Sequence, residues 1–129
     1  MSGKPRDDLM PVRVWLRQAL ALRLRLEEAV QREQLLERTQ GVSEALEAAR
    51  EQQRMATDRW ARRWAARAKA IDAVPDGRWA AVLGYEYLQG LRRGQIMGIL
   101  DCNIKTVQEW DLRGCEWIKT HINIKKEPR

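Results

Sequence analysis

The chain has 129 residues, of which 33% are charged, and its formal net charge is +6 with a pI of about 9.8. This length allows one modest core, or a small domain plus an extended helical element. Ala, Leu, Glu, Gln and Arg dominate the first part of the chain, which is typical of long helices and not of a sheet protein. The positive charge permits a nucleic-acid partner without requiring one.

The excess positive charge is spread evenly along the chain. Residues 1–40 carry eight basic and six acidic side chains, residues 41–75 seven and five, and residues 76–129 nine and seven. Each segment therefore has a net charge of +2. A basic face can arise only from the arrangement of these side chains in space.

The sequence contains few groups that could support catalysis or hold a cofactor. His121 is the single histidine, and Cys102 and Cys115 have neither an obvious base nor the spacing of a metal-ligand pair. No phosphate-cradling GxxxxGK[ST] pattern occurs. We expect no enzymatic activity and no cofactor, and two buried apolar cysteines are favoured over a metal site with His121. Without a signal peptide or a membrane-length apolar run, a cytoplasmic protein is expected.

A first long helix is predicted, with Asp7 or Asp8 as its N-cap and Pro11 tolerated in its first turn. Its apolar residues recur at three- and four-residue steps, as in a coiled-coil seam, and they are Val12, Trp15, Ala19, Leu22, Leu26, Ala29 and Leu36. Further apolar residues widen this stripe and predict a second neighbour: Leu16, Leu20, Leu24 and Val30. A basic amphipathic helix on a membrane surface is the alternative interpretation.

A second long helix follows the break at Thr39–Gln40–Gly41, where Gly41 suits a C-cap and Ser43 an N-cap. Its apolar stripe, interrupted by Gln53 and Arg67, comprises Leu46, Ala49, Ala56, Trp60, Trp64, Ile71 and Val74. Two helices of about 30 residues joined by a short connection favour an antiparallel hairpin. We expect residues 1–75 to form this coiled-coil-like hairpin and to mediate oligomerisation, most simply as a dimer.

Basic residues also repeat along this second helix, namely Arg59, Arg62, Arg63 and Arg67, with Lys69 close by. Two interpretations stay open. The arginines form either a solvated face whose aliphatic stems cover the tryptophans or a stripe that follows the phosphates of a nucleic acid.

The segment Pro75–Asp76–Gly77 predicts a domain boundary, because proline stops the preceding helix, Asp76 can cap the next one and glycine frees the turn. A supporting helix is predicted from Arg78 to Gln89 and ends at Gly90. It presents to the core the side chains of Trp79, Val82, Leu83 and Tyr87. Residues 76–129 form the second predicted domain.

Two further helices in this domain have the pattern of a helix-turn-helix. The first spans about Arg92 to Leu100 and is expected to bury Ile96, Ile99 and Leu100. The turn follows at residues 101–103, where Asn103 can accept hydrogen bonds from the first turn of the next helix. That helix begins at Ile104, and its buried stripe consists of Val107, Trp110, Gly114 and Ile118.

This block is similar to the C-terminal part of phage-encoded transcriptional activators of the RinA/ArpU type, and more distantly to region 4 of bacterial sigma factors. The matching pieces are Tyr87-Leu88-Gln89-Gly90, Ile96, Leu100, Asn103 and Thr106-Val107. About a quarter of the chain matches at motif level. The resemblance implies a phage or prophage regulator of late or packaging genes that binds double-stranded DNA.

On this interpretation the helix from Ile104 enters the major groove. Lys105, Gln108 and Glu109 are predicted to contact base edges, and Arg92, Arg93 and Arg113 to contact phosphates. The full candidate DNA-binding set is Arg92, Arg93, Lys105, Thr106, Gln108, Glu109, Leu112 and Arg113. Two alternatives stay open: an adaptor that docks on host RNA polymerase, and the DNA-recognition small subunit of a packaging terminase, which would form a ring.

Overall fold

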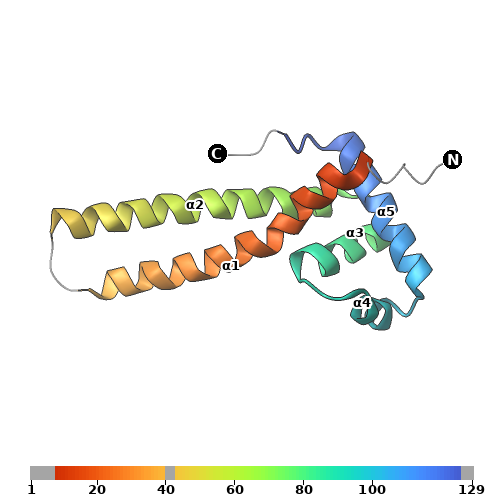
Figure 1. Ribbon diagram of the computed structural model, residues 1–129, viewed down its shortest axis with the longest axis horizontal. Helices are drawn as coiled ribbons and strands as arrows, with labels where there is room; N and C mark the ends of the chain where they lie inside the picture. The colour runs from red at the N-terminus through yellow and green to blue at the C-terminus, as the bar shows by residue number, and fades with distance from the viewer. Residues whose placement is uncertain (1–7, 40–42, 126–129) are drawn as a thin grey trace.

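The computed structural model describes residues 8–39 and 43–125 (Figure 1). Every regular element in these ranges is helical, as composition and periodicity predicted. The elements are α1 (Met10–Arg38), α2 (Glu44–Ala73), α3 (Gly77–Leu83), η2 (Gly84–Leu88), α4 (Arg93–Leu100) and α5 (Ile104–His121). Among these helices, none is both long and apolar enough to cross a membrane.

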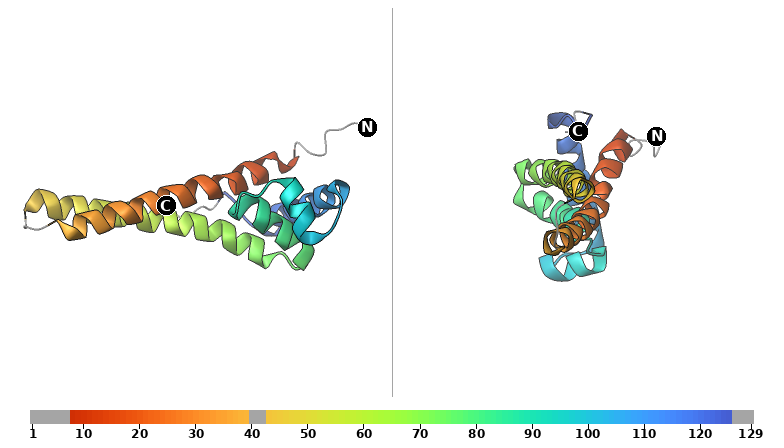
Figure 2. Two further views of the ribbon diagram at one scale, coloured as in Figure 1. Left: turned by 90° about the horizontal axis from the view of Figure 1, so that it is seen from below. Right: turned by 90° about the vertical axis from the view of Figure 1, so that its left-hand side faces the viewer.

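The two long helices, α1 and α2, lie side by side along the long axis of the molecule (Figures 1 and 2). They have 29 and 30 residues, close to the predicted length. Side chains of α2 donate to main-chain carbonyls of α1: Arg50 to Leu36 at 3.0 Å, Gln53 to Ala29 at 3.2 Å and Arg67 to Trp15 at 2.8 Å. These contacts join the two helices over most of their length.

Local signals identified most helix starts. The side chain of Ser43 accepts from the Leu46 amide at 3.1 Å, and that of Asp76 accepts from the Arg78 amide at 2.9 Å. The start of α1 differs from the prediction, because Leu9 is its N-cap and makes no side-chain cap. Asp8 instead forms an ion pair with Lys119 at 3.3 Å. Asp7, Gln40 and Gly41 lie outside the described residues.

The shorter elements gather at the end of the long pair where α1 begins and α2 ends (Figure 1). The buried side chains of this region come from both predicted domains and form one cluster: Leu9, Val12, Trp15, Leu16, Ala70, Ile71, Val74, Leu83, Tyr87, Cys115 and Ile118. The boundary at residues 75–77 therefore marks the end of α2, but the hydrophobic core continues across it.

The wide apolar stripe of α1 has its second neighbour within the same chain. Leu16 is fully buried in the shared cluster. Leu20 is half-buried and lies against Gly90, whose positive φ of 72° ends the η2 segment. The second neighbour predicted for Leu16 and Leu20 is therefore the C-terminal part of the same chain. Leu24 and Val30 stay exposed.

The predicted supporting helix consists of α3 and the wider π-helical turn η2, and it buries Val82, Leu83 and Tyr87 as expected. In α4, Ile96 is buried against Val82 and Val107 in a second small cluster. The burial predicted for Ile99 is wrong, since its side chain is 52% exposed. An eight-residue helix has room for one narrow buried stripe, and Ile99 lies outside it.

The turn between α4 and α5 is short, and Asp101 adopts the left-handed conformation at φ 52°. Asn103 is the N-cap of α5, as predicted, and its Oδ1 accepts from the Thr106 amide at 2.9 Å. The helix then buries Val107, Gly114 and Ile118 along the predicted stripe. The exposed side chains of α5 lie outside this stripe and include Lys105, Gln108, Glu109 and Arg113.

Candidate nucleic-acid interface

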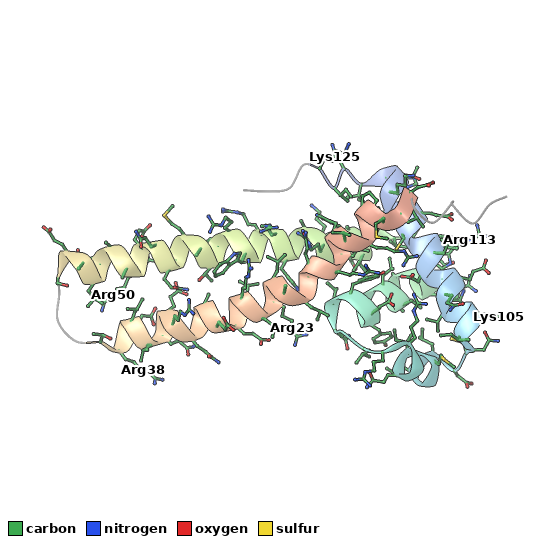
Figure 3. The ribbon with its side chains drawn as sticks, in the orientation of Figure 1. Arg23, Arg38, Arg50, Lys105, Arg113 and Lys125 are labelled. Atoms are coloured by element: carbon green, nitrogen blue, oxygen red, sulfur yellow. The ribbon has the colours of Figure 1, made fainter. Side chains whose placement is uncertain are left out.

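The first turns of α5 carry the side chains that are freest to meet a ligand. Lys105 and Gln108 are exposed and have no hydrogen-bond or ion-pair partner within the described part of the chain. Glu109 and Arg113 are exposed too, but they pair with each other across one turn at 3.4 Å. Lys105 and Arg113 lie along the outer edge of α5 in Figure 3. This face offers donors and an acceptor of the kinds that contact DNA.

Two other predicted contact residues on α5 have structural roles. The hydroxyl of Thr106 donates to Asn103 Oδ1 at 3.0 Å and so takes part in the helix cap. Leu112 was expected to point outward, but it is half-buried and packs against the shared core. The part of α5 that is available for contact with a ligand is therefore smaller than the sequence pattern predicted.

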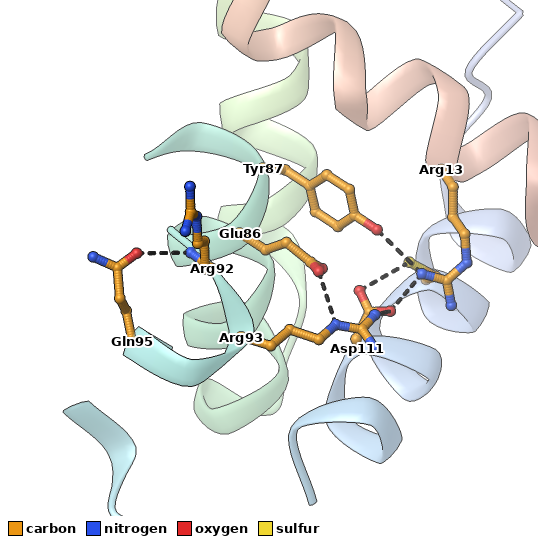
Figure 4. A network of polar contacts seen from close by, with 8 residues as sticks. Arg13, Glu86, Tyr87, Arg92, Arg93, Gln95 and Asp111 are labelled. Carbon is orange, nitrogen blue, oxygen red and sulfur yellow. Dashed lines mark hydrogen bonds and ion pairs between the residues drawn. The ribbon is translucent and has the colours of Figure 1, made fainter. Parts of the chain in front are cut away.

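The two arginines at the start of α4 differ in their surroundings. Arg92 is exposed, and its main-chain amide donates to Gln95 Oε1 at 2.9 Å, which holds the first turn of the helix. Arg93 donates to Glu86 Oε1 at 3.1 Å and to Asp111 Oδ2 at 3.4 Å (Figure 4). Arg93 can therefore contact a ligand only through N–H groups that do not bond to Glu86 or Asp111.

A buried ionic network joins α1, η2, α4 and α5 around Asp111, whose side chain is 1% exposed (Figure 4). Arg13 donates to Asp111 Oδ2 and, at 3.1 Å, to the Tyr87 hydroxyl. The thiol of Cys115 contacts Asp111 Oδ1 at 3.8 Å. An isolated charge at this depth would be strongly destabilising, so the arginines compensate for the burial of Asp111.

The pKa values of the surrounding groups follow from this burial. Burial of Arg13 lowers its pKa, but the hydrogen bond to Asp111 and the negative charge of Asp111 together have the larger effect. The pKa of Arg13 is therefore raised. Burial, helped by the charge of Asp111, raises the pKa of Cys115 to about 12 and raises that of Tyr87 as well. The pKa of Glu86 is raised by burial and by Asp111, against the opposing effect of Arg93. The thiol and the phenol stay protonated at neutral pH.

The sequence interpretation missed Asp111 and Arg13. Asp111 lies between Val107 and Gly114 at helical spacing, so it occupies a position where the buried stripe calls for an apolar side chain. An aspartate at such a position signals a buried ion pair. The sequence alone could not identify its partner, because Arg13 is 98 residues away.

The basic stripe of α2 is also interrupted in the structure. Arg67 is completely buried, and it donates to the carbonyls of Trp15 and Arg63 and to Gln18 Oε1. Its guanidinium lies 4.6 Å from the centroid of the Trp15 ring. Arg67 is therefore an interior residue that links the long helices. It cannot belong to a surface that follows phosphates.

The described residues contain no group of three or more side chains suited to holding a metal ion. Cys115 is buried, Cys102 is half-buried, and both are free thiols. His121 stacks on Trp117 with ring centroids 4.4 Å apart, and its Nδ1 lies 2.9 Å from the Trp117 carbonyl oxygen.

Comparisons of the chain with protein-family models, curated proteins and solved structures returned no match.

Proposed function

We propose that the protein is a sequence-specific regulator of transcription that binds double-stranded DNA. In this proposal α4, the turn at residues 101–103 and α5 form a helix-turn-helix, with α5 as the recognition helix. The long helices α1 and α2 form the antiparallel hairpin. The resemblance to phage activators extends the proposal to control of late or packaging genes. The observation that carries the proposal is the pair of exposed, partner-free side chains Lys105 and Gln108 on the capped start of α5.

The positive charge of Arg92, at the start of α4, supports the same function. Arg92 is exposed at the start of α4, where free main-chain amides and the helix dipole favour an anion. A phosphate contact there would hold α5 in register along the groove. Lys105 and Gln108 would then be close enough to hydrogen-bond base edges.

A second candidate function is that of an adaptor that docks on RNA polymerase. Two acidic side chains, Glu109 and Glu116, are exposed on the same helix. Carboxylates are repelled by the phosphate backbone, whereas they suit a basic protein surface. Only binding measurements separate the two functions.

The test begins with the selection of bound duplexes from a random-sequence library. The selected site and a scrambled duplex are then titrated at several salt concentrations with the parent protein, Gln108→Ala and Arg92→Ala. If Gln108 reads a base, Gln108→Ala should lose about 1–3 kcal/mol on the selected site and little on the scrambled one. If Arg92 holds a phosphate, Arg92→Ala should weaken both complexes alike and lower the salt slope by about one.

Arg38→Ala is the matched control, because it removes the same charge from the far end of α1 (Figure 3). It should bind both duplexes as the parent does. Failure of the parent to bind any duplex would refute the proposal. So would variants that all behave like the parent, and co-purification of the protein with RNA polymerase in the absence of DNA would then favour the adaptor.

A further inference from the structure

A polar recess of about 240 Å³ lies between α1, α4 and α5. Its lining consists of Arg13, Arg17, Arg93, Gln108, Asp111 and Leu112. It therefore adjoins Gln108, one of the proposed base contacts, but two of its arginines come from the first long helix. The sequence interpretation assigned α1 to oligomerisation alone.

Two of these arginines are held in place from inside the molecule. Asp111 accepts from both Arg13 and Arg93, and Glu86 accepts from Nε of Arg93. In Arg13 these bonds involve one terminal nitrogen. In Arg93 they involve Nε and one terminal nitrogen. Since a guanidinium has five N–H donors, both side chains keep donors for a ligand. Their orientation is set before any ligand arrives, which reduces the entropic cost of binding.

The third arginine, Arg17, follows Arg13 by one helical turn and is exposed. It has no hydrogen-bond or ion-pair partner within residues 8–39 and 43–125. The lining contains three positive guanidinium groups and one negative carboxylate, that of Asp111. The carboxylate of Glu86, which pairs with Arg93, supplies a second negative charge. One positive charge remains uncompensated. This balance suits a singly charged anion.

We propose that this recess binds one phosphate of the DNA backbone, with Arg17 as its principal contact. The inference rests on the proposed function and adds α1 to the DNA-binding surface. A phosphodiester carries one negative charge, and arginine donors match the geometry of its oxygens. The recess adjoins Gln108, so a phosphate held there would fix the register of α5 against the bases.

The contact also gives the ionic network a role in binding. Asp111 joins α1 to α4 and α5 through Arg13 and Arg93. The first long helix and the helix that carries Gln108 are therefore held in one arrangement when they meet DNA. A phosphate in the recess would touch both.

The experiment compares the parent with Arg17→Ala and Arg17→Gln, titrated on the selected and the scrambled duplexes over a range of salt concentrations. Each variant should weaken both complexes alike and reduce the salt-dependence slope by about one. Arg17→Gln keeps most of the aliphatic stem and removes the charge, so it guards against a loss of packing. Arg25→Ala is the matched control, as an exposed arginine two turns further along α1, and it should keep the parental slope.

Single uncharged methylphosphonate substitutions in the selected duplex identify the phosphate itself. One substitution should weaken the parent complex and have no further effect on Arg17→Gln, because the same contact has already been lost. If every substitution weakens both proteins equally, or if the Arg17 variants keep the parental slope, the recess binds no phosphate. A parent protein that binds neither duplex would overturn the proposed function, and this inference with it.

Discussion

At the scale of single residues, Asp111 links α5 to both α1 and α4. Removing one partner of a buried ion pair leaves an uncompensated charge, which typically costs about 3–5 kcal/mol. Arg13 and Arg93 reach Asp111 from different helices. The carboxylate therefore constrains how α1 and α4 pack against α5, and it places both arginines at the edge of the recess.

Gly114 shows how closely α5 approaches its supporting helix. A Cβ at this position would lie 2.7 Å from Cδ1 and 3.0 Å from Cγ of Leu83, which is itself fully buried. We expect Gly114→Ala to overpack the core and to reduce the free energy of unfolding by about 1–3 kcal/mol. Urea denaturation followed by circular dichroism measures this change.

Gly98 provides the control for Gly114. It is also helical, but it is exposed and a Cβ there would meet no atom within 4 Å. Gly98→Ala should therefore leave stability unchanged or raise it by up to about 1 kcal/mol, since alanine is the better helix former. Equal midpoints for Gly114→Ala and the parent would show that Leu83 relaxes without cost.

At the scale of elements, the pairing of α1 with α2 depends on polar contacts as well as on the apolar seam. Gln53 and Arg67 interrupt the stripe of α2, and both donate to main-chain carbonyls of α1. A helical carbonyl already accepts within its own helix and can accept a second bond. Gln53 and Arg67 therefore fit the interface because each forms a hydrogen bond to the main chain of α1.

Arg67→Ala should be among the most destabilising changes in the long pair. It removes a buried side chain that packs on the Trp15 ring and leaves Gln18 without its partner. We expect a loss of about 2–5 kcal/mol in the free energy of unfolding, comparable to other large-to-small core changes. Arg59→Ala, an exposed arginine on the same helix, should change it by less than about 0.5 kcal/mol. Thermal or urea melts of the two variants compare these effects, and equal losses would contradict the assigned role of Arg67.

At the scale of the whole molecule, part of α1 remains uncovered. Leu24 and Val30 are 60% and 42% exposed. Val30 borders a shallow groove of about 490 Å³ that Leu26 and Trp64 also line. Apolar area left in water costs about 25 cal/mol per Å². A second copy of the chain is the simplest partner for these exposed side chains.

We therefore predict that the parent sediments as a dimer at tens of micromolar, because association buries these exposed apolar side chains. The double variant Leu24→Glu with Val30→Glu should shift the protein to monomer, since it places charge in the interface. Met55→Glu is the control, because Met55 is 62% exposed on the other long helix. A parent that sediments as a monomer would contradict self-association through α1.

The sequence by itself determined the elements of this protein. Three- and four-residue spacing of apolar side chains identified both long helices and the buried stripe of α5. Ser43, Asp76 and Asn103 identified helix starts, because a capping side chain bonds to amides only two or three residues away. Such interactions are local, so the pattern of residues along the chain contains them.

Only the tertiary structure decided which side chains are buried and with what partners. Arg67 was assigned to a surface stripe and Ile99 to the core, and both assignments were wrong. Leu16 and Leu20 were predicted to have a second neighbour, and the fold supplies it from the C-terminal part of the same chain. The ionic network and the recess at Arg17 depend on residues that are distant along the chain. Periodicity identifies the face of a helix that is apolar, whereas packing between distant segments determines what that face contacts.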